Sequence, residues 1–176
     1  MPSYSIRSTR EDDWPLVRAL RIENATDNAI SYGATPDATR AMTEDDWRMR
    51  ARRGTAPDAT SLAATELRTG RWIGMMSAQT GDADGPEPVL TGVYVTPGFR
   101  GRTHGVADAL LDGVLAWASG RASVLRLYVY EHAEPARRFY DRRGFRPTGR
   151  ARDLHLLGAD VRPEDGRTIE MVLPLD

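Results

Sequence analysis

The sequence contains no cysteine and, although it is rich in arginine, no lysine. The lack of cysteine excludes disulfide bonds, thiolate metal sites and a cysteine nucleophile. The lack of lysine excludes a Walker-type phosphate loop and a Schiff-base lysine, and all 24 basic side chains are therefore arginines. No apolar run approaches membrane-spanning length, and residues 1–7 carry no hydrophobic signal segment, so we expect a cytoplasmic protein without a membrane span.

The charge balance is close to neutral. A formal net charge of −1 argues against generic nucleic-acid binding, which usually requires a basic surplus. A hydrophobic content of 40% and a charged content of 28% are ordinary for a globular protein. The 176 residues are enough for one domain, residues 1–176, with a full hydrophobic core.

Local patterns predict alternating helices and strands. Strands are expected at residues 3–8, 61–66, 71–79, 89–95 and 124–130, followed by an antiparallel pair at 145–157 and 168–175. Helices are expected from a capping box of Ser8 and Glu11 through Leu20, from a cap at Thr43 to about residue 53, and at 106–118 and 135–143. Residues 24–42 show no clear period and are expected to be irregular, while 81–88 form an acidic turn. This order indicates an α+β sheet with helices on both faces.

The stretch 93–107 is the most informative part of the chain. A β-branched and aromatic strand is stopped by a Thr-Pro-Gly turn, two arginines follow among glycines, and an amphipathic helix then begins. A loop at a helix N-terminus directs backbone N–H groups toward an anion, and the helix dipole favours negative charge there. Arginine adds fork-shaped donors, so this stretch predicts a phosphate-binding loop.

The loop resembles the acetyl-CoA-binding motif of the GNAT superfamily of N-acetyltransferases, Arg/Gln-x-x-Gly-x-Gly/Ala. The six positions are Arg100, Gly101, Arg102, Thr103, His104 and Gly105. The resemblance implies that their N–H groups, together with the helix start at Val106, hold the pyrophosphate. Thr103 replaces the usual glycine, which would weaken cofactor binding if that position required a positive φ. We interpret His104 as a loop side chain rather than a catalytic base.

A second stretch resembles the other cofactor motif of the same family, Asn-x-x-Ala-x-x-x-Tyr-x-x-x-Gly-Phe. The alanine, tyrosine, glycine and phenylalanine are present as Ala136, Tyr140, Gly144 and Phe145. Ala133 occupies the asparagine position, so that side-chain contact to the cofactor is lost. Two motifs in the right order and at the right separation are together quite specific.

The resemblance implies a fold and a mechanism. The fold is the three-layer α+β GNAT fold, with a mixed, mostly antiparallel sheet of six to seven strands. Its central strand carries a bulge and splays from its neighbour, which leaves a slot for the pantetheine arm. The main chain at Val93, Tyr94 and Val95 pairs with that arm and polarises the thioester, while Tyr140 protonates the leaving thiolate. Acetyl-CoA is the expected co-substrate, and no metal is expected.

The general base and the acceptor are less constrained. Glu87 is the candidate base, Asp82 and Asp84 are remoter ones, and a water chain is equally compatible. Acidic residues in 24–46 and 81–88 would suit a cationic amine, although helix capping and turn formation also explain them. The acceptor could be a small amine, an amino acid, an antibiotic or a protein N-terminus.

The function predicted from the sequence is therefore acetyl transfer from acetyl-CoA to a primary amine within a ternary complex, since no cysteine can carry an acetyl intermediate. Two alternatives are a family member that uses a longer acyl-CoA and a CoA-binding module that has lost catalysis. A DNA-binding or scaffold role is disfavoured by the neutral charge. The expected partners are a small-molecule or peptide amine, not nucleic acid or membrane, and the protein could be a monomer or a homodimer.

Overall fold

The computed structural model describes residues 1–176. The strands are β1 Tyr4–Ser8, β2 Ala59–Glu66, β3 Trp72–Asp82, β4 Gly85–Val95, β5 Val124–Tyr130, β6 Arg146–Asp153 and β7 Arg167–Pro174. The helices are α1 Trp14–Asp27, α2 Ala29–Tyr32, α3 Pro36–Arg40, α4 Glu44–Arg52, α5 Val106–Ala118 and α6 Glu134–Arg142. None of the helices has both the length and the apolarity needed to cross a membrane.

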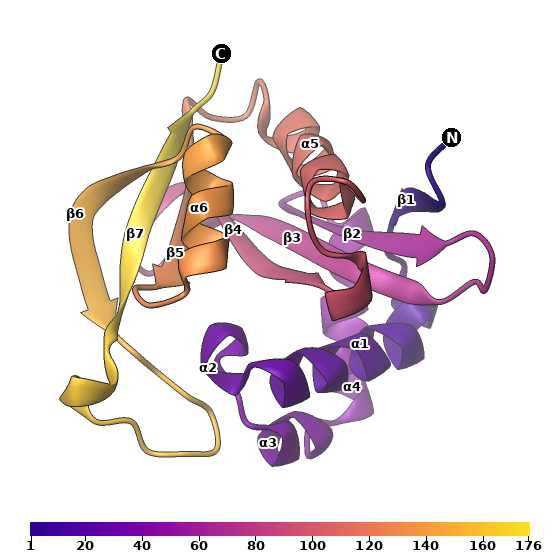
Figure 1. Cartoon of the computed structure of the whole chain (residues 1–176), viewed down its shortest axis with the longest axis horizontal. Coiled ribbons are helices and arrows are strands. Elements are labelled where there is room, and N and C mark those ends of the chain that lie inside the picture. Colours follow the sequence, from indigo (N-terminus) through magenta and orange to yellow (C-terminus); the bar gives the residue numbers. More distant parts are fainter.

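One sheet holds all seven strands, in the order β1-β2-β3-β4-β5-β7-β6. Every neighbouring pair is antiparallel except β4 and β5, which are parallel. Figure 1 shows α5 and α6 above this sheet and α1 to α4 below it. The predicted fold class, a mixed and mostly antiparallel sheet between two helical layers, is confirmed.

A separate hydrophobic core fills each side of the sheet. The larger core packs α5 and α6 against the strands and includes the fully buried Leu110, Leu125 and Phe145. The smaller core lies under α1 and α4 and includes Trp47 and Tyr94. The alternation of side chains along a strand explains the division, because successive residues of β4 point to opposite cores.

The first helix begins later than predicted. Ser8 pairs with Leu62 as the last residue of β1, so it cannot cap a helix, and the predicted capping box with Glu11 is wrong. A 3₁₀ turn at Glu11–Asp13 leads into α1, and the backbone N–H of Arg10 donates to the Asp13 carboxylate over 2.8 Å. The pairing of β1 with β2 satisfies several backbone groups at once and outweighs one capping hydrogen bond.

Residues 24–42 are helical for the most part, in contrast to the irregular segment that we predicted. The helix α1 continues to Asp27, and two short helices, α2 and α3, follow it. Each short helix has its own cap: Asn28 accepts from the N–H of Ser31, and Thr35 accepts from the N–H of Ala38, both over 3.1 Å. Capping by asparagine and threonine starts these helices where no hydrophobic period is visible.

Most of the other predicted elements are confirmed. Thr43 caps α4 in a reciprocal capping box with Asp46, and Gly144 ends α6 in a left-handed conformation with φ +96°. The strand 124–130 and the helix 106–118 have the predicted bounds. The acidic segment 81–88 is mostly strand, because β3 runs to Asp82 and β4 begins at Gly85, which leaves a two-residue turn.

Candidate active site

The central strands part in the middle of the sheet. Only Val89 and Leu90 of β4 pair with β5, opposite Arg126 and Leu127. Beyond Leu90 the two strands separate, and the β3–β4 register shifts between Met75 and Ser77. Gly92 lies at this bulge with φ +58°. The bulge and the splayed strand pair implied by the family resemblance are therefore both present.

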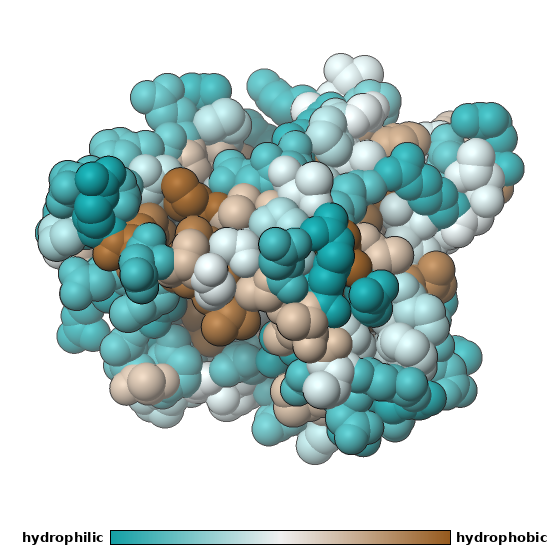
Figure 2. Space-filling model, turned by 90° about the horizontal axis from the view of Figure 1, so that it is seen from below, coloured by the Kyte–Doolittle hydropathy of each residue, from teal (hydrophilic) through white to brown (hydrophobic).

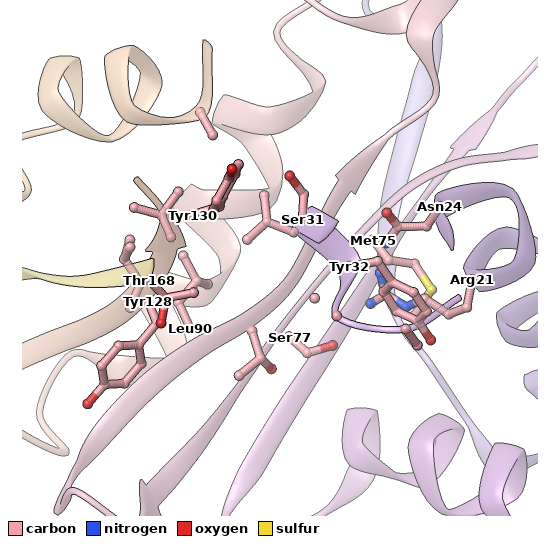
Figure 3. A pocket seen from close by; sticks show the side chains of 18 of the residues that line it. Arg21, Asn24, Ser31, Tyr32, Met75, Ser77, Leu90, Tyr128, Tyr130 and Thr168 are labelled. Atoms are coloured by element: carbon pink, nitrogen blue, oxygen red, sulfur yellow. The ribbon is translucent and has the colours of Figure 1, made fainter. Parts of the chain in front are cut away.

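A cavity of about 390 Å³ occupies the gap between the parted strands. Figure 2, a view from below, shows hydrophobic residues gathered in a hollow left of the centre, with hydrophilic residues around it. The lining comes from α1, α2, the bulge of β4, the end of β5 and α6. Figure 3 shows side chains from opposite walls, among them Arg21 from α1 and Tyr130 from β5. The cavity therefore reaches from one helical layer, through the sheet, to the other.

The main chain at the end of β4 faces this gap. The N–H of Thr96 donates to the carbonyl of Ile73 over 2.8 Å. Because bonded and non-bonded pairs alternate in an antiparallel ladder, the N–H and C=O of the preceding Val95 point away from β3. They point toward the gap between β4 and β5.

The side chains of the three predicted strand residues are divided between the two faces. Val93 lines the cavity, and Val95 belongs to the larger core. Tyr94 lies in the smaller core, where its hydroxyl donates to Glu23 over 2.9 Å. Burial and this carboxylate raise the pKa of Tyr94. The hydroxyl of Tyr94 is therefore engaged in the packing of α1.

The glycine- and arginine-rich loop leaves its backbone donors free. The N–H groups of residues 101–104 and of the first turn of α5, 106–108, donate to no other group of the chain. The two left-handed positions are Gly101, with φ +98°, and Gly105, with φ +69°. No residue other than glycine has a positive φ, so Thr103 is unstrained. Its replacement of the usual glycine has no conformational cost in this loop.

The two loop arginines differ in their contacts. The Nε of Arg100 donates to the carbonyl of Val95 over 2.7 Å, and its Nη2 donates to Asp27 over 2.6 Å. Arg100 therefore ties the loop to β4 and α1. Arg102 is exposed and takes part in no ion pair within the chain. Of the two fork-shaped donors that the sequence predicted, Arg102 is the one available to a phosphate. His104 packs against the ring of Phe99, 5.9 Å away, outside the cavity lining.

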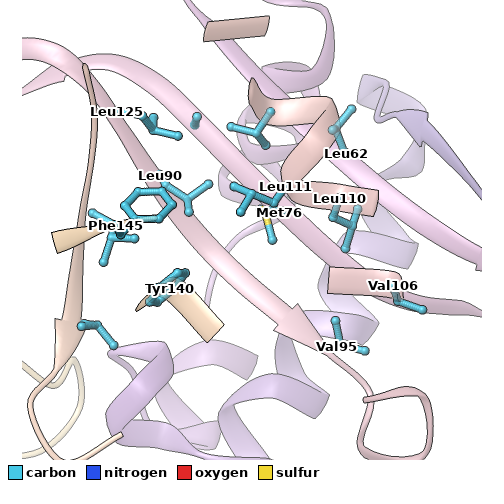
Figure 4. Close-up of a cluster of buried hydrophobic side chains, with 14 of the residues drawn as sticks. Leu62, Met76, Leu90, Val95, Val106, Leu110, Leu111, Leu125, Tyr140 and Phe145 are labelled. Atoms are coloured by element: carbon cyan, nitrogen blue, oxygen red, sulfur yellow. The ribbon is translucent and has the colours of Figure 1, made fainter. Parts of the chain in front are cut away.

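Tyr140 stands at the boundary between the larger core and the cavity. Figure 4 shows it at the edge of the buried cluster, near Phe145. Its ring lies 5.6 Å from that of Phe145, and burial raises the pKa of its hydroxyl. Ala133 and Ala136 line the same wall. Ala133 precedes α6 without a side-chain cap, as its identity requires. The second motif is thus brought to the gap between β4 and β5.

The predicted base is not on the cavity wall. The carboxylate of Glu87 lies 3.8 Å from Nε of Arg126. Nη2 of the same arginine forms an ion pair with Asp82 over 2.8 Å. Asp84 accepts from Tyr128 and from Arg152. None of these three acids lines the cavity, so their placement does not support the role of general base.

Four polar side chains on the α1 side of the cavity were not predicted from the sequence. They are Arg21, Asn24, Arg50 and Arg53. Arg21 and Asn24 continue the buried stripe of Val17 and Leu20 along α1. A charged residue within an apolar helical stripe was the available signal.

The comparisons with known proteins agree with this geometry. The model of the Acetyltransferase (GNAT) family matches residues 20–145. An acetyltransferase of the GNAT family from Streptococcus pneumoniae has a TM-score of 0.77 and 16% identity over 98% of this chain and 99% of its own. A GCN5-related N-acetyltransferase from Kribbella flavida has a TM-score of 0.73 and 22% identity over 98% of both chains. NAA60 of Arabidopsis thaliana in complex with acetyl-CoA has a TM-score of 0.69 and 18% identity over 97% of this chain and 98% of its own. No curated protein matches the sequence.

Proposed function

Because this chain belongs to the acetyltransferase (GNAT) family, we propose that it transfers an acetyl group from acetyl-CoA to a primary amine within a ternary complex. One observation carries the proposal. The gap between β4 and β5 has a main-chain edge with the N–H of Val95 on one side and Tyr140 on the other, and the loop with unpaired N–H groups directly follows β4.

The residues of the loop fit a diphosphate. Several N–H groups converge at the N-terminus of α5, where the helix dipole is positive. Arg102 can add a charge-assisted hydrogen bond. The gap beyond Leu90 exposes one edge of β4, so an extended pantetheine arm would pair there as an added strand does. The same edge carries the N–H of Val95, which would stabilise the oxyanion of the thioester.

The chemistry follows from these positions. Acetyl-CoA supplies an activated acyl carbon and a thiolate leaving group. As the free amine attacks that carbon, a C–N bond forms and the C–S bond breaks. The hydroxyl of Tyr140, whose pKa is raised by burial, stays protonated at neutral pH and gives its proton to the departing thiolate. The attacking nitrogen loses one proton as the amide forms, and this proton restores the phenol of Tyr140, so the products are the neutral amide and the CoA thiol. Tyr140 and Val95 therefore act at opposite ends of the breaking bond.

The proton of the incoming ammonium takes a different route. No aspartate, glutamate or histidine lines the cavity. A water chain, rather than Glu87, then deprotonates the acceptor, and the rate is expected to rise with pH toward the pKa of the amine itself.

The test is calorimetric titration of acetyl-CoA into the wild type and into two matched variants, Arg102→Ala in the loop and Arg150→Ala on the exposed strand β6. Micromolar binding is expected, weakened about tenfold by Arg102→Ala and unchanged by Arg150→Ala. Turnover with an amine panel is then measured for Tyr140→Phe. We expect a loss of roughly 100-fold in kcat with little change in acetyl-CoA affinity.

Three other results would change the proposal. Binding without turnover of any amine would favour a CoA-binding module that has lost catalysis. Tighter binding and faster turnover with a longer acyl-CoA would favour that donor. The absence of any acetyl-CoA binding would overturn the assignment of this site.

A further inference from the structure

Arg21 is a buried cation without a partner. Its residue surface is 5% exposed, and its Nη1 is fully buried without a hydrogen-bond acceptor. It takes part in no ion pair, and burial lowers the pKa of its guanidinium to about 10. A buried unpaired charge is costly, and native proteins almost always pair one. Arg21 therefore needs an explanation that the fold alone does not provide.

The guanidinium lies against the bulge of β4. A Cβ built on Gly92 would collide with Nη2 of Arg21 and would lie 3.1 Å from its Cζ. Gly92 also has a positive φ of +58°, a backbone conformation that favours glycine. This contact places the positive charge of Arg21 beside the main chain at which we expect the thioester to bind.

Two more arginines line the same cavity, and neither is within ion-pair distance of a carboxylate. Arg50 and Arg53 take part in no ion pair, and burial together with the charge of Arg50 lowers the pKa of Arg53. No acidic side chain is among the residues that line the cavity. Of the acidic residues that suggested a cationic acceptor, Asp27 pairs with Arg100 and Glu44 pairs with Arg48, and none lines the cavity. The α1 wall is therefore cationic.

The coenzyme does not need these arginines. Its phosphates are assigned to the free N–H groups at the start of α5, whereas Arg21, Arg50 and Arg53 belong to α1, α4 and the turn after α4. The other polar side chains on this wall are neutral, among them Ser31, Tyr32 and the buried Asn24. Figure 3 shows Arg21, Asn24 and Tyr32 on the same side of the cavity.

We propose that the acceptor is an amine that also carries a carboxylate, and that Arg21, supported by Arg50 and Arg53, binds this carboxylate. The proposal rests on the proposed function, because it names the substrate class of the same site. A guanidinium presents parallel N–H donors that match a carboxylate. With the carboxylate on Arg21, an amine a few bonds away lies at the bulge, where the acetyl carbon is expected.

The experiment compares free amino acids with their carboxamides as acceptors, because each pair differs at the anionic group alone. kcat/KM is measured for the wild type, Arg21→Met, Arg21→Lys and the surface control Arg150→Met. We expect the wild type to prefer the carboxylates by at least tenfold, although the amine of a carboxamide loses its proton more readily. Arg21→Met should reduce kcat/KM for carboxylates by roughly 100-fold, mainly through KM, and Arg21→Lys should recover part of it.

The same variants separate this inference from the proposed function. The affinity for acetyl-CoA should be unchanged in Arg21→Met, and thermal-shift titration with amino acids should stabilise the wild type but not that variant. Equal or better use of carboxamides by the wild type overturns the carboxylate proposal while leaving the acetyltransferase intact. The carboxylate proposal is also overturned if Arg21→Met lowers kcat/KM equally for carboxylates and carboxamides. It is overturned as well if no amino acid raises the melting temperature of the wild type. A wild type that does not bind acetyl-CoA refutes the proposed function instead.

Discussion

Arg21 and Arg126 are both only 5% exposed, yet the fold surrounds them in opposite ways. Nη2 of Arg126 donates to Asp82 over 2.8 Å and to the carbonyl of Glu87 over 2.9 Å, and Glu170 lies 3.7 Å from Nη1. Burial alone would lower the pKa of Arg126, but the hydrogen bond and charge of Asp82 raise it above its ordinary value. The groups around Arg126 come from β3, β4 and β7, so this arginine holds strands together.

Arg21 has no such set of partners. Its charged neighbours are Arg50 and Arg53, and its pKa falls where that of Arg126 rises. Two arginines with the same exposed fraction thus differ in whether the fold supplies acceptors for their guanidinium groups. A cation whose partners belong to the fold stabilises the fold, whereas a cation without partners on a cavity wall is available to a ligand.

The largest expected effect is on the Arg126 side. Arg126→Met removes the only cation beside the buried carboxylate of Glu170 and the ion-pair partner of the partly buried Asp82, and the free energy of unfolding should fall by about 3–5 kcal/mol. Urea denaturation measures this loss, and Arg150→Met, an exposed control, should stay within about 0.5 kcal/mol of the wild type. A loss below about 1 kcal/mol would mean that the network of Arg126 is not structural.

The next effect depends on pH. The Arg126 hydrogen bond lowers the pKa of Asp82 in the folded protein, against the effect of burial, to below its value of 3.8 in the unfolded chain. The stabilisation is therefore complete above pH 3.8 and is lost as the pH falls through the folded pKa. Asp82→Asn should cost about 1.5–3 kcal/mol at pH 7 and progressively less below pH 3.8. Unfolding at pH 7 and pH 3 tests this, and a cost that does not change with pH would contradict it.

The third effect has the opposite sign. Arg21→Met removes an uncompensated buried charge and keeps an apolar chain of similar length, so the free energy of unfolding should rise by about 1–2 kcal/mol. The gain should persist at pH 3, because no carboxylate faces Arg21. Denaturation in buffer without amino acids gives the value. A destabilised variant would mean that Arg21 supports the bulge at Gly92 and is structural after all.

The sequence was sufficient for the elements whose signals are local. The helix 106–118 and the strand 124–130 follow from periodicity, and the free N–H groups of the loop follow from its glycines and the helix start. Local signals failed where a distant segment competes. Ser8 has the composition of a helix cap, but its pairing with Leu62 of β2 decides its role.

The candidate site was predicted only where its residues belong to a contiguous motif. Tyr140 reaches the cavity because its motif is contiguous along α6. Arg100 is far from its partner Asp27 in the sequence, so its use as a tie between the loop and α1 has no local signature. The role of Arg21 rests on the absence of a partner, which is a property of the whole packed domain rather than of any window of residues.

The smallest effect tests whether the arginines of the cavity share one site. Arg53→Gln removes a like charge near Arg21, so we expect a gain of about 0.5 kcal/mol in the wild-type background. In the Arg21→Met background the repulsion is already gone, and the same substitution should have almost no effect. A double-mutant cycle of unfolding free energies measures the difference directly. Additive effects would mean that the two charges do not interact, and the carboxylate site would then consist of Arg21 alone. Coupling of the expected sign would mean that the two cations lie in one site, where a bound carboxylate relieves their repulsion.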